Sequence, residues 1–120
     1  MQILISSQQF EVDQELREHI ERRIHFRLAR YSDRLVKARV RIAGINGPHG
    51  VETKNFSIEI HLRHSASVFL QDTGFNLSAS IERVIERAER TVARKIENMQ
   101  PRRQGKPPII LDDQKWREDA

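Results

Sequence analysis

The chain has 120 residues and a formal net charge of +4, a length that suits one domain and is too short for two. No apolar run approaches the roughly 18 residues that span a bilayer, the N-terminus lacks a signal-peptide pattern, and the absence of cysteine excludes disulfides and thiolate chemistry. We therefore expect a cytoplasmic protein with no membrane partner.

The first part of the chain predicts a strand followed by a helix. Residues 2–6 have the composition of a short strand, and Asp13 is a plausible helix N-cap. Apolar residues then recur every three or four positions, which predicts an amphipathic helix over 13–31; they are Leu16, Ile20, Ile24, Leu28 and Tyr31.

The middle of the chain predicts three strands. Residues 36–43 and 56–63 alternate between apolar and polar side chains, as half-buried strands do, with Val36, Ala38, Val40 and Ile42 facing inward in the first. Residues 44–54 are rich in glycine and predict a long hairpin loop. A third segment, Ala66–Leu70, leads into a turn at 72–74.

The last predicted element is a second amphipathic helix that Asn76 begins and Pro101 ends. Its apolar stripe comprises Leu77, Ile81, Val84, Ile85, Ala88, Val92, Ile96 and Met99. The order β-α-β-β-β-α predicts an α+β fold with a four-stranded mixed sheet and both helices on one face. We expect one domain over 1–100 and a flexible tail over 101–120.

The second helix carries a pattern that favours nucleic acid. Four arginines fall on one side of its helical wheel, Arg83, Arg87, Arg90 and Arg94, with the glutamates gathered beside them. The first helix carries His19, Arg23, Arg27 and Arg30 along one flank of its apolar stripe. Two such rows on one sheet face would form a groove or ridge that suits a phosphate backbone.

Interpretations that need no nucleic acid stay open for these arginines. Glu86 and Arg90 have the spacing of a helical ion pair, so a salt-bridged surface helix also fits the pattern. The chain has 16 arginines and only 5 lysines, which suits phosphate binding but also fits a general preference for arginine at exposed positions.

Other chemistry finds little support in the sequence. The five histidines lack the spacing of metal ligands, and no glycine-rich phosphate loop or nucleophile elbow is present. The outer sheet face is a weak candidate for base stacking, because its central strand offers Glu59 and His61 where aromatics are needed. We therefore expect no enzyme, no cofactor, no metal and no small-molecule substrate.

Several segments together resemble the ribosome hibernation-promoting factor and ribosome-associated inhibitor family, also known as sigma-factor modulation proteins. The family's opening is similar to residues 1–3 and 11–18, and its Arg-Tyr-x-Asp-Arg motif is similar to residues 30–34. Gln71-Asp72-Thr73-Gly74 and the alternating acids and bases of 81–95 follow the family pattern. The match covers about residues 1–97.

This resemblance implies a bacterial RNA-binding protein that occupies the small ribosomal subunit and inhibits translation in stress or stationary phase. It also implies a fold like that of double-stranded-RNA-binding domains. Carried over by position, the rRNA-contacting basic residues are Arg23, Arg83, Arg87, Arg90, Arg94 and Lys95. With Arg27 and Arg30 of the first helix, these form the expected RNA-binding set. The chain resembles the short form of the family, and we expect it to be monomeric away from the ribosome.

The sequence departs from the family in three places. The first helix holds one extra residue around His25–Phe26, the tyrosine that opens the second helix is missing before Ala79, and the loop 44–54 is long. A rival hypothesis follows from this divergence, in which a protein-binding regulatory module keeps the fold but does not act on the ribosome.

Overall fold

The computed structural model describes residues 1–46 and 52–99 as one mixed sheet with two α-helices. The predicted order β-α-β-β-β-α is confirmed, with a short 3₁₀ helix, η1, inserted before the second strand. The elements are β1 (Gln2–Gln8), α1 (Gln14–Leu28), η1 (Ala29–Arg34), β2 (Leu35–Asn46), β3 (Glu52–Leu62), β4 (Val68–Gly74) and α2 (Leu77–Met99).

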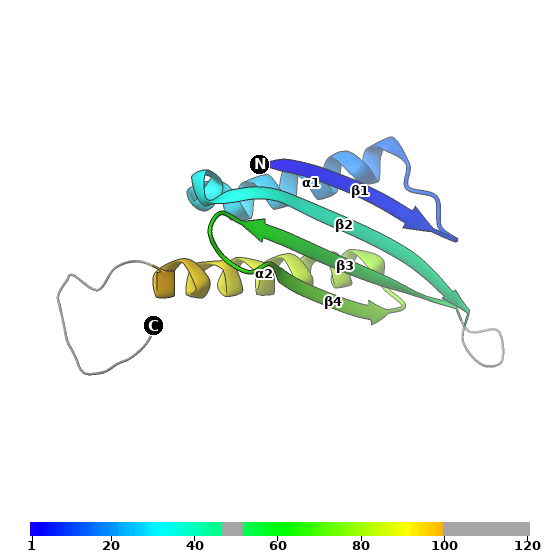
Figure 1. The fold of residues 1–120 in the computed structure, drawn as a ribbon. Coiled ribbons are helices and arrows are strands. Elements are labelled where there is room, and N and C mark those ends of the chain that lie inside the picture. The colour runs from blue at the N-terminus through cyan, green and yellow to red at the C-terminus, as the bar shows by residue number, and fades with distance from the viewer. Residues whose placement is uncertain (47–51, 100–120) are drawn as a thin grey trace, which may run out of the picture.

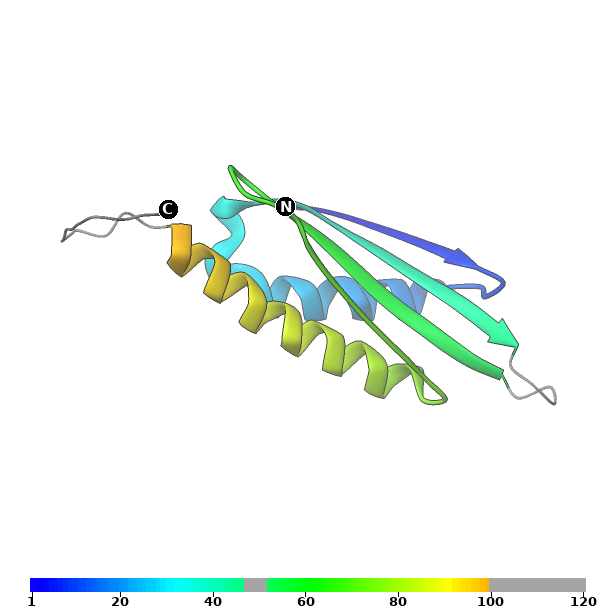
Figure 2. The same cartoon turned by 60° about the horizontal axis from the view of Figure 1, so that its bottom comes forward.

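The four strands lie in the order of the chain, β1-β2-β3-β4 (Figure 1). β1 pairs with β2 in parallel, because α1 carries the chain back between them, and the other two pairs are antiparallel. Figure 2 shows both helices on the same face of the sheet, as predicted. Neither α1 nor α2 covers the opposite face, which we call the outer face.

Both helices begin at the predicted caps. The Asp13 carboxylate accepts a hydrogen bond from the Leu16 N–H at 2.8 Å, and the Asn76 side-chain oxygen accepts one from the Ala79 N–H at 3.1 Å. The predicted helix over 13–31 is too long, because the α-helix ends at Leu28 and continues as η1. Helices commonly tighten in this way where the chain must turn, here into β2.

The core lies between the sheet and the helices. Ile20, Ile24 and Leu28 of α1 are almost completely buried, and Phe56 of β3 is the largest fully buried side chain. The predicted stripe of α2 is buried from Ile81 to Ile96, and comprises Ile81, Val84, Ile85, Ala88, Val92 and Ile96. The hydrophobic spacing therefore identified the inward faces of both helices correctly.

One inward residue was predicted wrongly. Val36 is 44% exposed, whereas its neighbour Leu35 is 1% exposed. The pairing of β2 with β3 shifts register between Leu35 and Lys37, as at a β-bulge. An extra residue in one strand reverses the alternation on one side of it, so Leu35 takes the inward place that the pattern assigned to Val36.

The predicted long loop over 44–54 is also wrong, because β2 reaches Asn46 and β3 begins at Glu52. Gly44 is a strand residue that pairs with Lys54. A Cβ atom at Gly44 would lie 2.6 Å from the backbone oxygen of Gln9, so a glycine is required by the close approach of the β1–α1 connection. Residues 47–51 lie outside the described residues.

β4 begins and ends later than predicted. Ala66 precedes the strand, and the segment 72–74 that was predicted as a turn is its last part. The predicted tail over 101–120 lies outside the described residues. Within residues 1–46 and 52–99, neither helix is long and apolar enough to cross a membrane.

Candidate nucleic-acid interface

α2 presents a continuous row of arginines on its exposed side. We call this row, Arg83, Arg87, Arg90 and Arg94, the arginine rail; all four side chains are exposed. At a rise of about 1.5 Å per residue, the rail extends for roughly 16 Å along the helix axis. Rigid backbone therefore holds four guanidinium groups at regular intervals on one surface.

The first residue of the rail shows which side of α2 it occupies. An Arg83 guanidinium nitrogen lies 2.7 Å from an Asp72 carboxylate oxygen at the end of β4. The hydroxyl of Ser80, which is fully buried, donates to the same oxygen at 2.8 Å. These two hydrogen bonds, that from Arg83 foremost, hold the pKa of Asp72 below its ordinary value. The rail thus follows the flank of α2 that adjoins β4.

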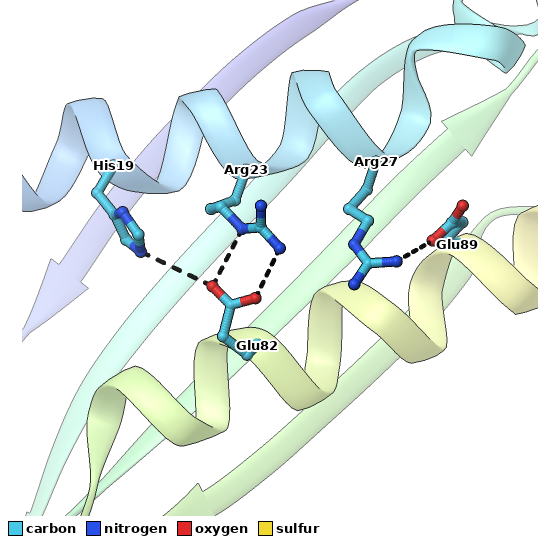
Figure 3. A network of polar contacts seen from close by, with 5 residues as sticks. All are labelled: His19, Arg23, Arg27, Glu82 and Glu89. Atoms are coloured by element: carbon cyan, nitrogen blue, oxygen red, sulfur yellow. Dashed lines mark hydrogen bonds and ion pairs between the residues drawn. The ribbon is translucent and has the colours of Figure 1, made fainter.

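The opposite flank of α2 is acidic and faces α1 (Figure 3). Glu82 accepts two hydrogen bonds from Arg23, at 3.1 and 2.9 Å, and His19 lies 3.8 Å from it. About two turns further along α2, the Glu89 carboxylate accepts a hydrogen bond from Arg27 at 2.8 Å. Arginines of α1 and glutamates of α2 therefore form the polar seam between the helices.

This seam overturns the expectation that the two arginine rows together form one groove or ridge. The glutamates of α2 lie between Arg23 and Arg27 on one side and the arginine rail on the other. Arg23 and Arg27 are less than one-third exposed, and each is paired with a carboxylate. The helical wheel located both charged sides of α2, but not which one would meet α1.

Within the rail, the four arginines differ in how far their charge is already compensated. Arg83 is bound to Asp72, and Arg90 lies 3.7 Å from Glu86 in a pair that is more than half exposed. No carboxylate of the described residues lies within 4.0 Å of the guanidinium of Arg87 or Arg94. The positive potential of the rail therefore has its main sources at Arg87 and Arg94.

Two further predicted residues lie apart from the rail. Arg30 is exposed on η1, where its guanidinium carbon lies 5.8 Å from the centre of the Tyr31 ring. Lys95 is half-buried, and at 100° per residue its position falls within the apolar stripe of α2, five turns after Leu77 and away from the rail. Of the predicted set, the structure brings together only the four arginines of α2.

The described residues contain no candidate metal site. Within residues 1–46 and 52–99, no group of three histidine, aspartate or glutamate side chains could hold a metal ion. A row of exposed guanidinium groups binds phosphate by charge and by paired N–H donors, without a cofactor.

The outer face also carries an exposed aromatic residue that was not predicted from the sequence. Phe69 of β4 is 59% exposed and lies directly across from Glu59 of β3. The signal was present in the sequence, because Val68 and Leu70 point inward and the residue between them must point outward.

The chain matches one protein-family model and is similar in fold to solved structures. The model of the family described as "Sigma 54 modulation protein / S30EA ribosomal protein" matches residues 3–100. A ribosomal subunit interface protein from Coxiella burnetii superposes with a TM-score of 0.68 at 18% identity, covering 81% of this chain and 99% of that one. The N-terminal domain of Thermus thermophilus Protein Y superposes with a TM-score of 0.65 at 24% identity, covering 79% of this chain and 99% of that one. No curated protein sequence matches significantly.

Proposed function

The chain belongs to the sigma 54 modulation protein / S30EA ribosomal protein family, and from this premise we propose that it binds rRNA of the small ribosomal subunit and inhibits translation in stress or stationary phase. The similar fold from Coxiella burnetii is that of a ribosomal subunit interface protein, which supports a ribosomal target. The proposed contact surface is the arginine rail of α2.

The observation that carries this proposal is the exposure of the rail on a rigid helix. Arg87 and Arg94 have no carboxylate partner among the described residues, so binding to phosphate costs them no ion pair. Arg83 and Arg90 lie between and beside them and add charge to the same surface. Contacts between arginine and phosphate account for most of the affinity of such interfaces and make it depend on salt.

The basic residues outside the rail have different roles in this proposal. Arg23 and Arg27 hold α1 against α2 through Glu82 and Glu89, and they contribute to RNA affinity mainly by positioning the helices. Arg30 of η1 and Lys95 of α2 lie outside the rail, and we assign them separate, secondary contacts with phosphate. If all four rail arginines contact phosphates of unpaired RNA, log affinity should fall with log salt with a slope of about −3.

Sedimentation with purified ribosomes in a sucrose gradient tests the proposal. The double variant Arg87→Glu and Arg94→Glu should remain at the top of the gradient and should no longer inhibit translation in a cell-free extract. Its fold should persist, because exposed substitutions usually change stability by less than about 0.5 kcal/mol.

The matched control reverses two arginines of α1 that do not face α2. Arg17→Glu and Arg22→Glu make the same change in net charge, and both side chains lie away from the seam with α2. This control should retain most of the ribosome binding. Equal losses in the two variants would refute a specific role for the rail, and undiminished binding of the rail variant would favour the protein-binding rival.

A further inference from the structure

The outer face of the sheet carries a second group of basic residues that the helical surface does not use. Strand register places Arg39, Glu59 and Phe69 side by side in one row across β2, β3 and β4. The next row holds Arg41, Ser57 and Gln71, and Lys37 lies on the same face beyond Arg39. None of these residues belongs to the interface proposed above.

The charge of this face is unbalanced. The strand residues described on it include three basic side chains, at Lys37, Arg39 and Arg41, against the single carboxylate of Glu59. Arg39 approaches Glu59 only to 3.8 Å and is about half exposed. No carboxylate of the described residues lies within 4.0 Å of Arg41. A polyanion would compensate these charges, whereas an uncharged protein surface would bury them unpaired.

The same residues surround a hollow in the outer face. Its volume is about 520 Å³, and its lining includes Arg39, Arg41, Ile45, Asn55, Phe69 and Gln71. The Phe69 ring supplies an exposed aromatic surface at one side. Asn55, which lies further along the hollow in the row of Thr73, donates to the Thr73 hydroxyl at 2.7 Å, so an amide group also lines the hollow. The hollow thus combines cations, an aromatic ring and hydrogen-bonding groups.

We propose that the outer face binds a short single-stranded RNA segment, with one base stacked on Phe69 and adjacent phosphates on Arg39 and Arg41. A base can stack on a side chain only when it is free of its own neighbours, so the ligand is single-stranded rather than duplex. The proposal goes beyond the rRNA contact of α2, because the sheet separates the two surfaces (Figure 2).

The test uses ribosome-free protein and a fluorescein-labelled ten-nucleotide oligouridylate. Fluorescence anisotropy is measured in the Arg87→Glu, Arg94→Glu background, which removes the main charges of the rail. In that background Phe69→Ala should weaken binding about tenfold, the loss expected for one base stack. The matched control is Phe75→Ala, whose ring is 75% exposed on the β4–α2 connection; it should change affinity less than about twofold.

Two further readouts test the roles of the charges and of the ring separately. Arg39→Ser with Arg41→Ser should make the slope of log affinity against log salt shallower by about 1.4, because two phosphate contacts are lost. Replacing Phe69 with tryptophan, together with Trp116→Phe to remove the chain's only natural tryptophan, should give fluorescence that the oligonucleotide quenches.

The proposal is overturned if the parent background does not bind the oligonucleotide, or if a duplex of equal length binds as well. It is also overturned if Phe69→Ala leaves oligonucleotide binding unchanged. Each of these failures leaves the rail experiment on ribosomes unaffected, so the two proposals can fail independently.

Discussion

Replacing Glu82 and Glu89 with glutamine should destabilise the fold while leaving RNA affinity equal or higher. Both carboxylates bind arginines of α1 across the seam, at 2.9 and 2.8 Å. Their loss removes two interhelical ion pairs, and it also leaves the positive charges of Arg23 and Arg27 without carboxylate partners, so that both can attract phosphate. The same double substitution therefore acts in opposite directions on stability and on binding.

The expected loss of stability follows from the exposure of the two pairs. The four side chains are between 26% and 44% exposed, so each pair contributes in the range of exposed ion pairs, about 0.2–1 kcal/mol. Glu82 accepts two hydrogen bonds from Arg23 and Glu89 accepts one from Arg27, so the change at Glu82 should cost at least as much as the change at Glu89. A total near 1 kcal/mol should lower Tm by about 4–8 °C for a domain of this size.

Calorimetry at low salt and in about 1 M salt measures this effect. The difference in Tm should shrink at high salt, where the Debye length is only about 3 Å. The control is Glu86→Gln with Glu97→Gln, which makes the same charge change on exposed positions of α2 that do not contact α1. If the two double variants had the same Tm, the ion-pair seam would not exist as described. Weaker RNA binding by the seam variant would mean that its acids contact the target.

Three further predictions concern the sheet and its connections. Asp72→Asn should lower stability above the usual Asp pKa of about 3.9, and the deficit should vanish as the pH falls through the lower folded-state pKa, because only the ionised carboxylate favours Arg83; urea unfolding against pH measures this, and a deficit that persists in acid would contradict it. Gly44→Ala should destabilise by about 1–3 kcal/mol through the clash with Gln9, and an unchanged denaturation midpoint would refute the close approach. Phe56→Ala should cost about 3–5 kcal/mol in the same assay; a loss below 1 kcal/mol would place this ring outside the core.

Much of the fold could be predicted from the spacing of apolar residues. Ile20, Ile24 and Leu28 mark one face of α1, and the longer stripe of α2 marks another, so both helices needed a common partner. Alternation in β3 predicted the inward residues from Phe56 to Leu62. The N-caps at Asp13 and Asn76 could also be predicted, because an N-cap side chain bonds to a backbone N–H only three residues later in the chain.

Features that depend on contacts between distant segments of the chain could not be predicted from the sequence patterns. The bulge that turns Val36 outward arises from the register of β2 against β3, and the place of Gly44 inside a strand arises from its contact with Gln9. Both features involve segments that are distant along the chain. Local alternation and glycine content therefore gave a wrong inward residue and a loop that was too long.

For the candidate site, the sequence alone determined that α2 has an arginine side and a glutamate side, because a helix presents every third or fourth residue on the same face. Only the tertiary structure decided that the glutamate side meets α1, so that Arg23 and Arg27 are paired with carboxylates, whereas Arg87 and Arg94 have no carboxylate partner among the described residues. Likewise, only the sheet brought Phe69 into one row with Arg39. A helical wheel fixes the angles within one helix, whereas which flank meets a neighbour depends on how two elements pack across the sheet.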